Sequence, residues 1–500
     1  MKFKHCLAIG TMSLLLAACG GSSNKIVFDL PAPIPAPSPT AKYHGIWLAP
    51  AYGQGIGIDD DELTIFEYTN DFCFFDDVVE EVELDDLTEL FNLSDDNTQL
   101  EQRFGFGTDD LYAPGIVFSK AAELPQACSA GYTPVEGDDN YTEDYAQDLR
   151  YFYQAFKELS VSIERQELDW DAMYETAEQA LIADPSDTTL VMSLVSMMEP
   201  LSDIHTSLGD EEDGAVVRFN NKPMYYDLFL EEYLALNNID ELETSAQQEA
   251  AGAYVDEQTA LLNSIIFDYA NDESDIKVAA NDLIAWFEVE GIGYLYIAAM
   301  TGFAEVEDEG AESSSLVLNA LESALDEAMS DLQNTTGLII DVRRNLGGED
   351  YLALAIASRF TDQEVVAYQK QAGLGDNKTP LREVTIAPRG DIQYLNPIVL
   401  LTSQTTVSAG EVFTMSMANL PHVTLIGEPT QGSLSDALGK VLPIGVPFSL
   451  SNETYLTPDG QWFEGQGIPV DVEVPAFTFA ERLAEQDIAL EVAFEYLIDQ

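Results

Sequence analysis

From about residue 284 onward the sequence predicts an α/β fold, because short apolar runs rich in β-forming residues alternate with longer helical patterns. Such alternation is typical of a largely parallel sheet whose functional loops follow the strand ends. Two other observations divide the rest of the chain. Residues 43–137 combine β-formers with glycine punctuation, and residues 141–208 have helical periodicity. We therefore expect an α/β core at 284–500, a β-rich N-terminal domain and a helical subdomain.

The elements expected in the core follow from these runs. Strands are predicted at 283–288, 293–298, 337–342, 365–369, 397–402 and 423–427, and helices at 312–333, 349–360 and 409–420. Residues after Gly432 read as short strands and turns, and a closing helix is predicted at 478–498.

The N-terminus has the pattern of an export signal. Residues 1–18 begin with Lys2 and Lys4, continue through an apolar centre and end in Leu16-Ala-Ala before Cys19. This ending resembles a bacterial lipobox, which implies cleavage before Cys19, lipidation of Cys19 and, by analogy, an outer-membrane location. An ordinary signal peptide followed by a chance cysteine is the alternative. Residues 19–42 are rich in proline and are predicted to form a semi-rigid tether.

Composition limits the range of partners. The 500 residues exceed one ordinary domain, and the formal net charge of −68 should repel nucleic acid and anionic lipid headgroups. No apolar run beyond the N-terminus is long enough to span a membrane. We expect a cell-envelope protein with no nucleic-acid partner, facing either the periplasm or the cell surface.

Two cysteines, Cys73 and Cys128, remain beyond the lipobox, and both fall in the β-rich domain at 43–137. An oxidising compartment permits a disulfide between them, whereas two unpaired structural cysteines are the alternative. Sequence alone gives no distance between them.

The middle of the chain is predicted to be mostly helical. Helices are expected at about 145–159, 171–182 and 188–201 within the subdomain at 141–208. Residues 209–283 read as an acidic, mostly helical insert with one short strand near 215–219.

The candidate nucleophile is Ser408, which follows the expected strand at 397–402 and precedes a helical pattern at 412–420. Backbone N–H groups converge at such a junction, and the helix dipole favours developing negative charge. The pair Ser408 and Glu411 also fits a helix capping box, which is the structural alternative.

A serine nucleophile needs a base and an orienting carboxylate. Histidines are few beyond the signal peptide, and His205, just past a predicted helix end, is the candidate base, although a structural histidine is the alternative. Glu464 stands out among the acids because Trp462 and Phe463 precede it, and an acid among aromatics can be buried and in need of a partner. One more surface glutamate is the alternative.

Oxyanion donors are expected at a glycine turn. The buried-strand pattern ending at Asp341 opens into Gly347-Gly348, where backbone N–H groups can approach a ligand closely. The Ala409 N–H, next to the serine, is the other natural donor. A plain strand–helix turn is the alternative for the glycines.

Taken together, these segments resemble the S41 peptidases, the family of C-terminal-processing and tricorn-like proteases. Six pieces match in the family's order, over about residues 145–208 and 284–475: Leu-Ser-Asp-Ile-His205-Thr, Tyr294-Leu-Tyr-Ile297, Asp341-Val-Arg-Arg-Asn345-Leu-Gly-Gly348, Ser408-Ala-Gly-Glu411, Gly427-Glu-Pro-Thr-Gln-Gly432 and Glu464-Gly-Gln-Gly467. The resemblance implies a crotonase/ClpP-like α/β core, peptide or protein substrates, and no metal or other cofactor. The PDZ domain common in the family is not visible here.

The resemblance also separates two catalytic layouts. One branch uses a Ser/Lys dyad with lysine directly after the glycine of Pro-Thr-x-Gly, a position that Ser433 takes here. The tricorn-like branch uses serine, histidine and glutamate, which map to Ser408, His205 and Glu464. In that reading Gly347 or Gly348 with Ala409 would hold the oxyanion.

The resulting expectation is a lipid-anchored serine endopeptidase of the cell envelope that acts through an acyl-enzyme. Two alternatives stay open: a non-catalytic S41 scaffold that binds peptides or a protein partner, and an enzyme that uses Lys440 as its base.

Overall fold

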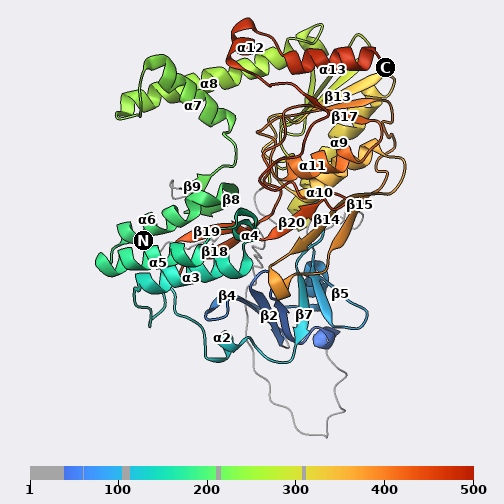
Figure 1. The fold of residues 1–500 in the computed structure, drawn as a ribbon. Coiled ribbons are helices and arrows are strands. Elements are labelled where there is room, and N and C mark those ends of the chain that lie inside the picture. Colours follow the sequence, from blue (N-terminus) through green and yellow to red (C-terminus); the bar gives the residue numbers. More distant parts are fainter. Residues whose placement is uncertain (1–38, 60, 104–112, 210–215, 307–310) are drawn as a thin grey trace, which may run out of the picture.

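The computed structural model describes residues 39–59, 61–103, 113–209, 216–306 and 311–500 (Figure 1). The expected signal peptide at 1–18, Cys19 and nearly all of the tether lie outside these residues. Within the described part of the chain, no helix is both long and apolar enough to cross a bilayer.

The core sheet has seven strands in the order β10-β11-β12-β13-β16-β17-β21. Strands β12, β13, β16, β17 and β21 of this sheet run parallel to one another, and β10 and β11 extend one edge with antiparallel pairing. The residues of β12, β13 and β16 are all buried, as expected for strands covered on both faces. The strands are β10 (Lys277–Ala279), β11 (Ile284–Val289), β12 (Ile292–Ile297), β13 (Gly337–Asp341), β16 (Ile398–Thr402), β17 (Val423–Gly427) and β21 (Val472–Glu473). The α/β expectation is confirmed.

One predicted strand of this sheet lies elsewhere. The run at 365–369 is part of β14 (Val365–Ala372), which pairs antiparallel with β15 (Arg382–Ile386) and β20 (Glu453–Leu456) in a separate three-stranded sheet. From Tyr368 to Ala372 this strand alternates between more and less buried residues, as a strand with one covered face does.

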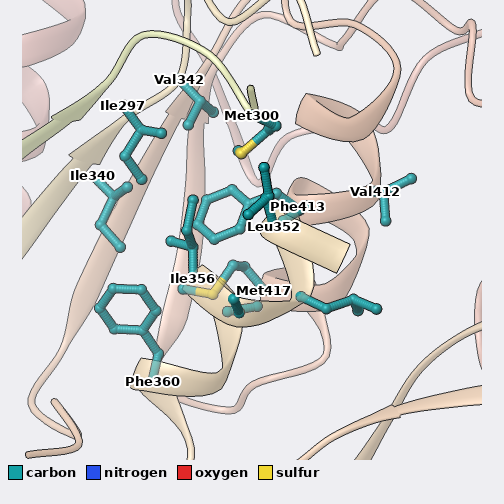
Figure 2. Close-up of a cluster of buried hydrophobic side chains, with 14 of the residues drawn as sticks. Ile297, Met300, Ile340, Val342, Leu352, Ile356, Phe360, Val412, Phe413 and Met417 are labelled. Carbon is teal, nitrogen blue, oxygen red and sulfur yellow. The ribbon is translucent and has the colours of Figure 1, made fainter. Parts of the chain in front are cut away.

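Helices cover both faces of the core sheet. On one face, α9 (Ala311–Leu332), α10 (Asp350–Ala357) and α11 (Ala409–Ala418) pack on side chains such as Ile340. On the other face, α13 (Ile488–Ile498) packs on the alternate residues, such as Ile339. Figure 2 shows Phe413 and Met417 of α11 among the side chains of the first face. Fully burying one such side chain contributes about 1.5–3 kcal/mol, so α11 is firmly attached to the sheet.

The predicted closing helix at 478–498 is two helices, α12 (Phe479–Ala484) and α13. Glu485 adopts a left-handed conformation with φ 53°, which ends α12, and the Asp487 carboxylate accepts the Leu490 N–H and begins α13. The prediction missed the break because no glycine or proline marks it.

The N-terminal part forms a second, antiparallel seven-stranded sheet in the order β4-β3-β2-β1-β7-β6-β5. A disulfide joins Cys73 of β4 to Cys128 of α2, the pairing that the sequence left open. The elements are β1 (Gly45–Ala49), β2 (Gln54–Asp59), β3 (Glu62–Tyr68), β4 (Cys73–Glu80), α1 (Leu84–Leu90), β5 (Phe91–Leu93), β6 (Gln99–Gln102), β7 (Val117–Ala121) and α2 (Gln126–Ser129).

Four helices follow this sheet: α3 (Tyr145–Leu159), α4 (Val161–Gln166), α5 (Trp170–Ala183) and α6 (Asp187–Met198). The sheet and helices share one apolar core, in which Trp47 and Phe152 are packed with Phe448 from far along the chain. The link is a four-stranded sheet in the order β18-β19-β8-β9, made of β8 (Asp203–Leu208), β9 (Val217–Phe219), β18 (Ala437–Val441) and β19 (Pro447–Ser451). This sheet joins the helical region to the part of the chain that forms the α/β core.

The insert between β9 and β10 is a pair of helices, α7 (Tyr225–Asn237) and α8 (Ser245–Phe267). Figure 1 shows this pair extending away from the rest of the molecule, with α12 beside α8.

A buried ion cluster holds the end of β13. The Arg343 guanidinium is fully buried and lies between Asp341, with Nε to Oδ1 at 3.0 Å, and Asp487 at the start of α13, with Nη1 to Oδ1 at 2.7 Å. The two carboxylates raise the pKa of Arg343, although burial opposes them. Asp341 and Arg343 thus form a buried pair, which fixes the strand end from which the glycine turn begins.

Candidate active site

Ser408 lies in a strained turn between β16 and α11. Its backbone has φ 56° and ψ −127°, a conformation that non-glycine residues seldom adopt and that persists where the surroundings impose it. A sharp strand-to-helix turn of this kind exposes a serine hydroxyl above a sheet in α/β hydrolases. Ser408 is partly exposed, whereas its neighbours Val407 and Ala409 are buried. The serine side chain is therefore reachable on a rigid support.

The capping-box alternative is confirmed. The Ser408 side chain faces the Glu411 N–H without a full hydrogen bond, and the Glu411 carboxylate accepts the Ser408 N–H at 3.3 Å. The serine therefore sits at the helix cap with a hydroxyl that is not tied down by a strong capping bond.

Glu411 is fully buried and connects the serine turn to the loop after β17. Its Oε1 accepts the Thr430 hydroxyl at 2.6 Å and the Gly432 N–H at 2.8 Å, and its Oε2 accepts the Ser433 N–H at 2.8 Å. Burial raises the pKa of Glu411, while these hydrogen bonds, the one from Thr430 foremost, lower it. The Ser433 carbonyl in turn accepts the Ser408 N–H at 3.1 Å. One carboxylate therefore sets the position of the serine relative to residues 430–433.

The predicted oxyanion donors are only partly assembled. A Cβ on Gly347 would lie 2.6 Å from the Ser408 Cβ and 3.1 Å from the Ala409 N, so glycine alone permits this approach. Ala409 is the first residue of α11, where a helix provides no acceptor for the N–H. The Gly347 N–H, however, donates to Asn345 Oδ1 at 2.9 Å.

Gly348 packs elsewhere. A Cβ on Gly348 would lie 2.3 Å from the Met300 carbonyl oxygen, and the two residues form a β-bridge. Of the three expected donors, the structure therefore places Gly347 and Ala409 beside Ser408 and packs Gly348 against residue 300.

His205 is partly exposed on β8, between β9 and β19. Its backbone is fixed, because its N–H donates to Asp203 Oδ1 at 3.0 Å and its carbonyl accepts the Ser449 hydroxyl at 2.6 Å. Desolvation lowers the pKa of His205, while the charges of Asp203 and Asp436 act to raise it. The imidazole is therefore held mainly in the neutral form that a general base requires.

Glu464 is 2% exposed, so it is no surface glutamate. Its Oε2 accepts the N–H groups of Leu434 and Ser435, each at 3.0 Å. Burial raises the pKa of Glu464 well above the ordinary 4.5, and the charges of Asp203 and Glu411 add to the rise. Glu464 and Glu411 thus hold consecutive residues of one loop, 432–435.

The expected hydrogen bond between Glu464 and His205 is not formed. Among the described residues, His205 Nδ1 and Glu464 Oε1 are both buried without a partner, and no hydrogen bond joins His205 to Ser408. Backbone N–H groups of the loop bind the other Glu464 oxygen, Oε2. Asp203 lies within electrostatic range of both side chains, and it also accepts the backbone N–H of His205.

The structure gives the alternative base, Lys440, another partner and adds contacts that the sequence missed. The buried Lys440 ammonium, on β18, pairs with Glu67 Oε1 of β3 at 2.7 Å, which argues against its use as a base. Asp203 and the bonds from Glu411 to residues 430–433 were missed, although Asp203 and Glu411 both stand inside the quoted motifs. No three His, Cys, Asp or Glu side chains in the described ranges come together as a set of metal ligands.

A reachable serine in a strained strand–helix turn, with a helix N–H beside it, defines the site of a serine-hydrolase type of protein. Residues 291–474, which make up most of the α/β core, match the family model described as Peptidase family S41.

Named relatives agree with this family. The carboxyl-terminal-processing protease of Synechocystis is 28% identical over 168 residues, which make up 33% of this chain and 38% of the Synechocystis protein. The carboxy-terminal processing protease CtpA of Bacillus subtilis is 29% identical over 157 residues, 31% of this chain and 32% of CtpA. The chain therefore matches about a third of the length of these relatives.

A solved structure from Parabacteroides merdae has the same fold. It superposes with a TM-score of 0.54 at 23% identity and covers 71% of this chain and 97% of its own. The S41-type fold expected from the motifs is confirmed.

We expect the difference in melting temperature between the Glu464→Gln variant and the unmodified protein to shift in favour of the variant as pH rises. The raised pKa means that the folded chain keeps a proton that the unfolded chain releases above pH 4.5. The free energy of unfolding of the unmodified protein therefore falls as pH rises above 4.5. Glutamine does not titrate, so the variant lacks this loss, and its side-chain carbonyl can still accept the two N–H groups. Melting temperatures of both proteins at about pH 5 and about pH 8 measure the effect. A difference that is constant or shrinks with pH would contradict it.

Proposed function

We propose that this protein is a serine endopeptidase that hydrolyses peptide bonds through an acyl-enzyme. The single observation that carries the proposal is the strained Ser408 turn, which holds a reachable hydroxyl beside the Ala409 N–H. The family of the α/β core supports peptide or protein substrates.

In this mechanism Ser408 Oγ attacks the carbonyl carbon of the scissile peptide and gives its proton to the neutral His205. The oxyanion forms beside the Ala409 N–H and the start of α11, whose dipole favours negative charge. The Gly347 N–H becomes a second donor when the Asn345 side chain releases it. His205 then protonates the leaving amine, and water attacks the acyl-enzyme with His205 again as base.

Glu464 completes the site in this proposal when it is ionised, because its carboxylate then accepts the Nδ1–H of His205. The two atoms that would form this bond, His205 Nδ1 and Glu464 Oε1, are both buried and unpartnered in the described structure. A buried polar atom without a partner costs about 1–3 kcal/mol, so a modest movement that joins them on substrate binding would be favourable.

The same unpartnered atoms favour a second candidate function, a non-catalytic S41 scaffold that binds a peptide or protein. The two candidates differ in the nucleophilicity of Ser408, which is directly measurable.

We expect Ser408→Ala to abolish both peptide cleavage and labelling by a fluorophosphonate probe. The probe reacts only with an activated serine, so labelling depends on the proton transfer proposed for His205. Ser416→Ala is the matched control, because this hydroxyl lies on the same helix and donates to the Val412 carbonyl. Equal labelling of the unmodified protein and Ser408→Ala, or no labelling of either, would favour the binding scaffold.

We expect the acid limb of kcat/KM to lie below pH 6.5, because desolvation lowers the pKa of His205 and only the neutral imidazole accepts a proton. Asp436 is exposed, and its charge raises the pKa of His205. Asp436→Asn should therefore move the acid limb to still lower pH, whereas Asp362→Asn, whose charge acts on the pKa of His422 instead, should not. A limb that moves to higher pH in Asp436→Asn would contradict His205 as the base.

We also propose that the mature chain is an outer-membrane lipoprotein carried on a lipidated Cys19. The support is the lipobox-like Leu16-Ala-Ala-Cys19 and the proline-rich tether that follows. A lipid anchor would hold the peptidase at the membrane, facing the periplasm or the cell surface.

Cys19→Ser should abolish incorporation of labelled palmitate and release the protein from the membrane fraction. Cys6→Ser is the matched control, because Cys6 lies within the apolar part of the expected signal and should leave labelling intact. Palmitate on the Cys19→Ser protein would overturn the anchor.

A further inference from the structure

Residues 220–224, which lead from β9 into α7, contact two loops of the site, the one that Glu411 binds and the one that carries Glu464. The Lys222 ammonium donates to three backbone carbonyls, at Pro429 (3.3 Å), Thr430 and Gln466 (3.0 Å). The first two belong to the loop that Glu411 holds, and the third follows Glu464. A single side chain therefore connects the two loops.

The residues on either side of this ammonium strengthen the connection. Asn221 Nδ2 donates to the carbonyls of Gln431, at 2.9 Å, and Gly465, at 2.8 Å, and so bridges the same two loops. The Gln431 side chain accepts the Lys222 N–H at 2.8 Å and donates to the Lys222 carbonyl at 2.9 Å. These bonds fix the backbone of residue 222 as well as its side chain.

The space for the Lys222 ammonium is itself specific. A Cβ on Gly467 would lie 2.7 Å from Lys222 Nζ, so a side chain at that position would displace it. Burial lowers the pKa of Lys222, while the charges of Glu411 and Glu428 act to raise it. Desolvating an ammonium is costly unless its donors are satisfied, and here the carbonyls of the two loops satisfy them.

The contacts continue from Lys222 to the nucleophile. Thr430, whose carbonyl binds Lys222, donates its hydroxyl to Glu411, and Glu411 accepts the Ser408 N–H. On the other side, Gly465, whose carbonyl binds Asn221, directly follows Glu464. The spacing of Ser408 and Glu464 thus depends on the bridge at 221–222.

We infer that Lys222 is a positioning residue for the proposed hydrolysis. It sets the distance between the loop that holds the serine turn and the loop that carries Glu464, and it acts through Glu411 and Glu464 without touching the substrate. The inference rests on the proposed function for its kinetic consequence, although the bridging of the two loops does not.

Lys222→Met keeps the length and apolar stem of the side chain and removes its three donors. We expect kcat per fluorophosphonate-labelled serine to fall by about 10- to 100-fold, with KM changed by no more than about threefold, because the reacting groups lose alignment while substrate contacts remain. Lys277→Met is the matched control, since that exposed ammonium pairs with Asp331 and Glu327 on α9. A melting temperature that falls while kcat per labelled serine stays unchanged would show a purely structural role and overturn the inference.

Amide hydrogen exchange tests the bridge without reference to activity. The N–H groups of residues 432–435, which Glu411 and Glu464 hold, should exchange faster in Lys222→Met than in Lys277→Met. Unchanged exchange would overturn the inference even if the protein is a peptidase, and faster exchange would support it even if Ser408→Ala disproves the peptidase. If Lys222→Met does not fold, Asn221→Ser removes the two neighbouring donors and should give the same pair of results.

Discussion

The buried carboxylate of Glu411 is the constraint on which the site depends. It accepts hydrogen bonds from Ser408, Thr430, Gly432 and Ser433, which come from two segments far apart in the sequence. Satisfying a buried carboxylate requires several donors at fixed positions, so these three backbone N–H groups and one hydroxyl are placed by the same pair of oxygen atoms. Glu411 lies on α11, which is packed on the sheet through Phe413, so the donors that it binds are held in place by the core. The strained backbone of Ser408 is maintained by this arrangement.

Much of the fold could be predicted because its signals are local. Runs of apolar residues fixed the strands β13 and β16, and a serine between a strand and a helical pattern located the turn at Ser408. The sheet to which β14 belongs could not be predicted, since an alternating run specifies a half-covered strand without naming its partner. The break before Asp487 was also missed, because Glu485 takes a left-handed conformation that sequence usually marks with glycine.

The site was harder to predict than the fold, because hydrogen bonding depends on side-chain positions. Sequence motifs selected Ser408, His205 and Glu464, and the structure buries Glu464 as the flanking aromatics suggested. No sequence signal indicated that the N–H groups of Leu434 and Ser435 would occupy one oxygen of Glu464. The sequence also contained no indication of the role of Lys222, because its partners are backbone carbonyls, which every residue carries.

The shared core of the N-terminal sheet and the helices has a consequence for the order of assembly. Phe152 packs against Phe448 in a core that also contains Trp47, and β8, which carries His205, pairs with β19. A chain that emerges from the ribosome or a translocation channel N-terminus first therefore lacks part of its first core until most of its length has appeared. The same late strand brings His205 to the rest of the site. A growing chain consequently cannot present a finished site to its surroundings before synthesis is nearly complete.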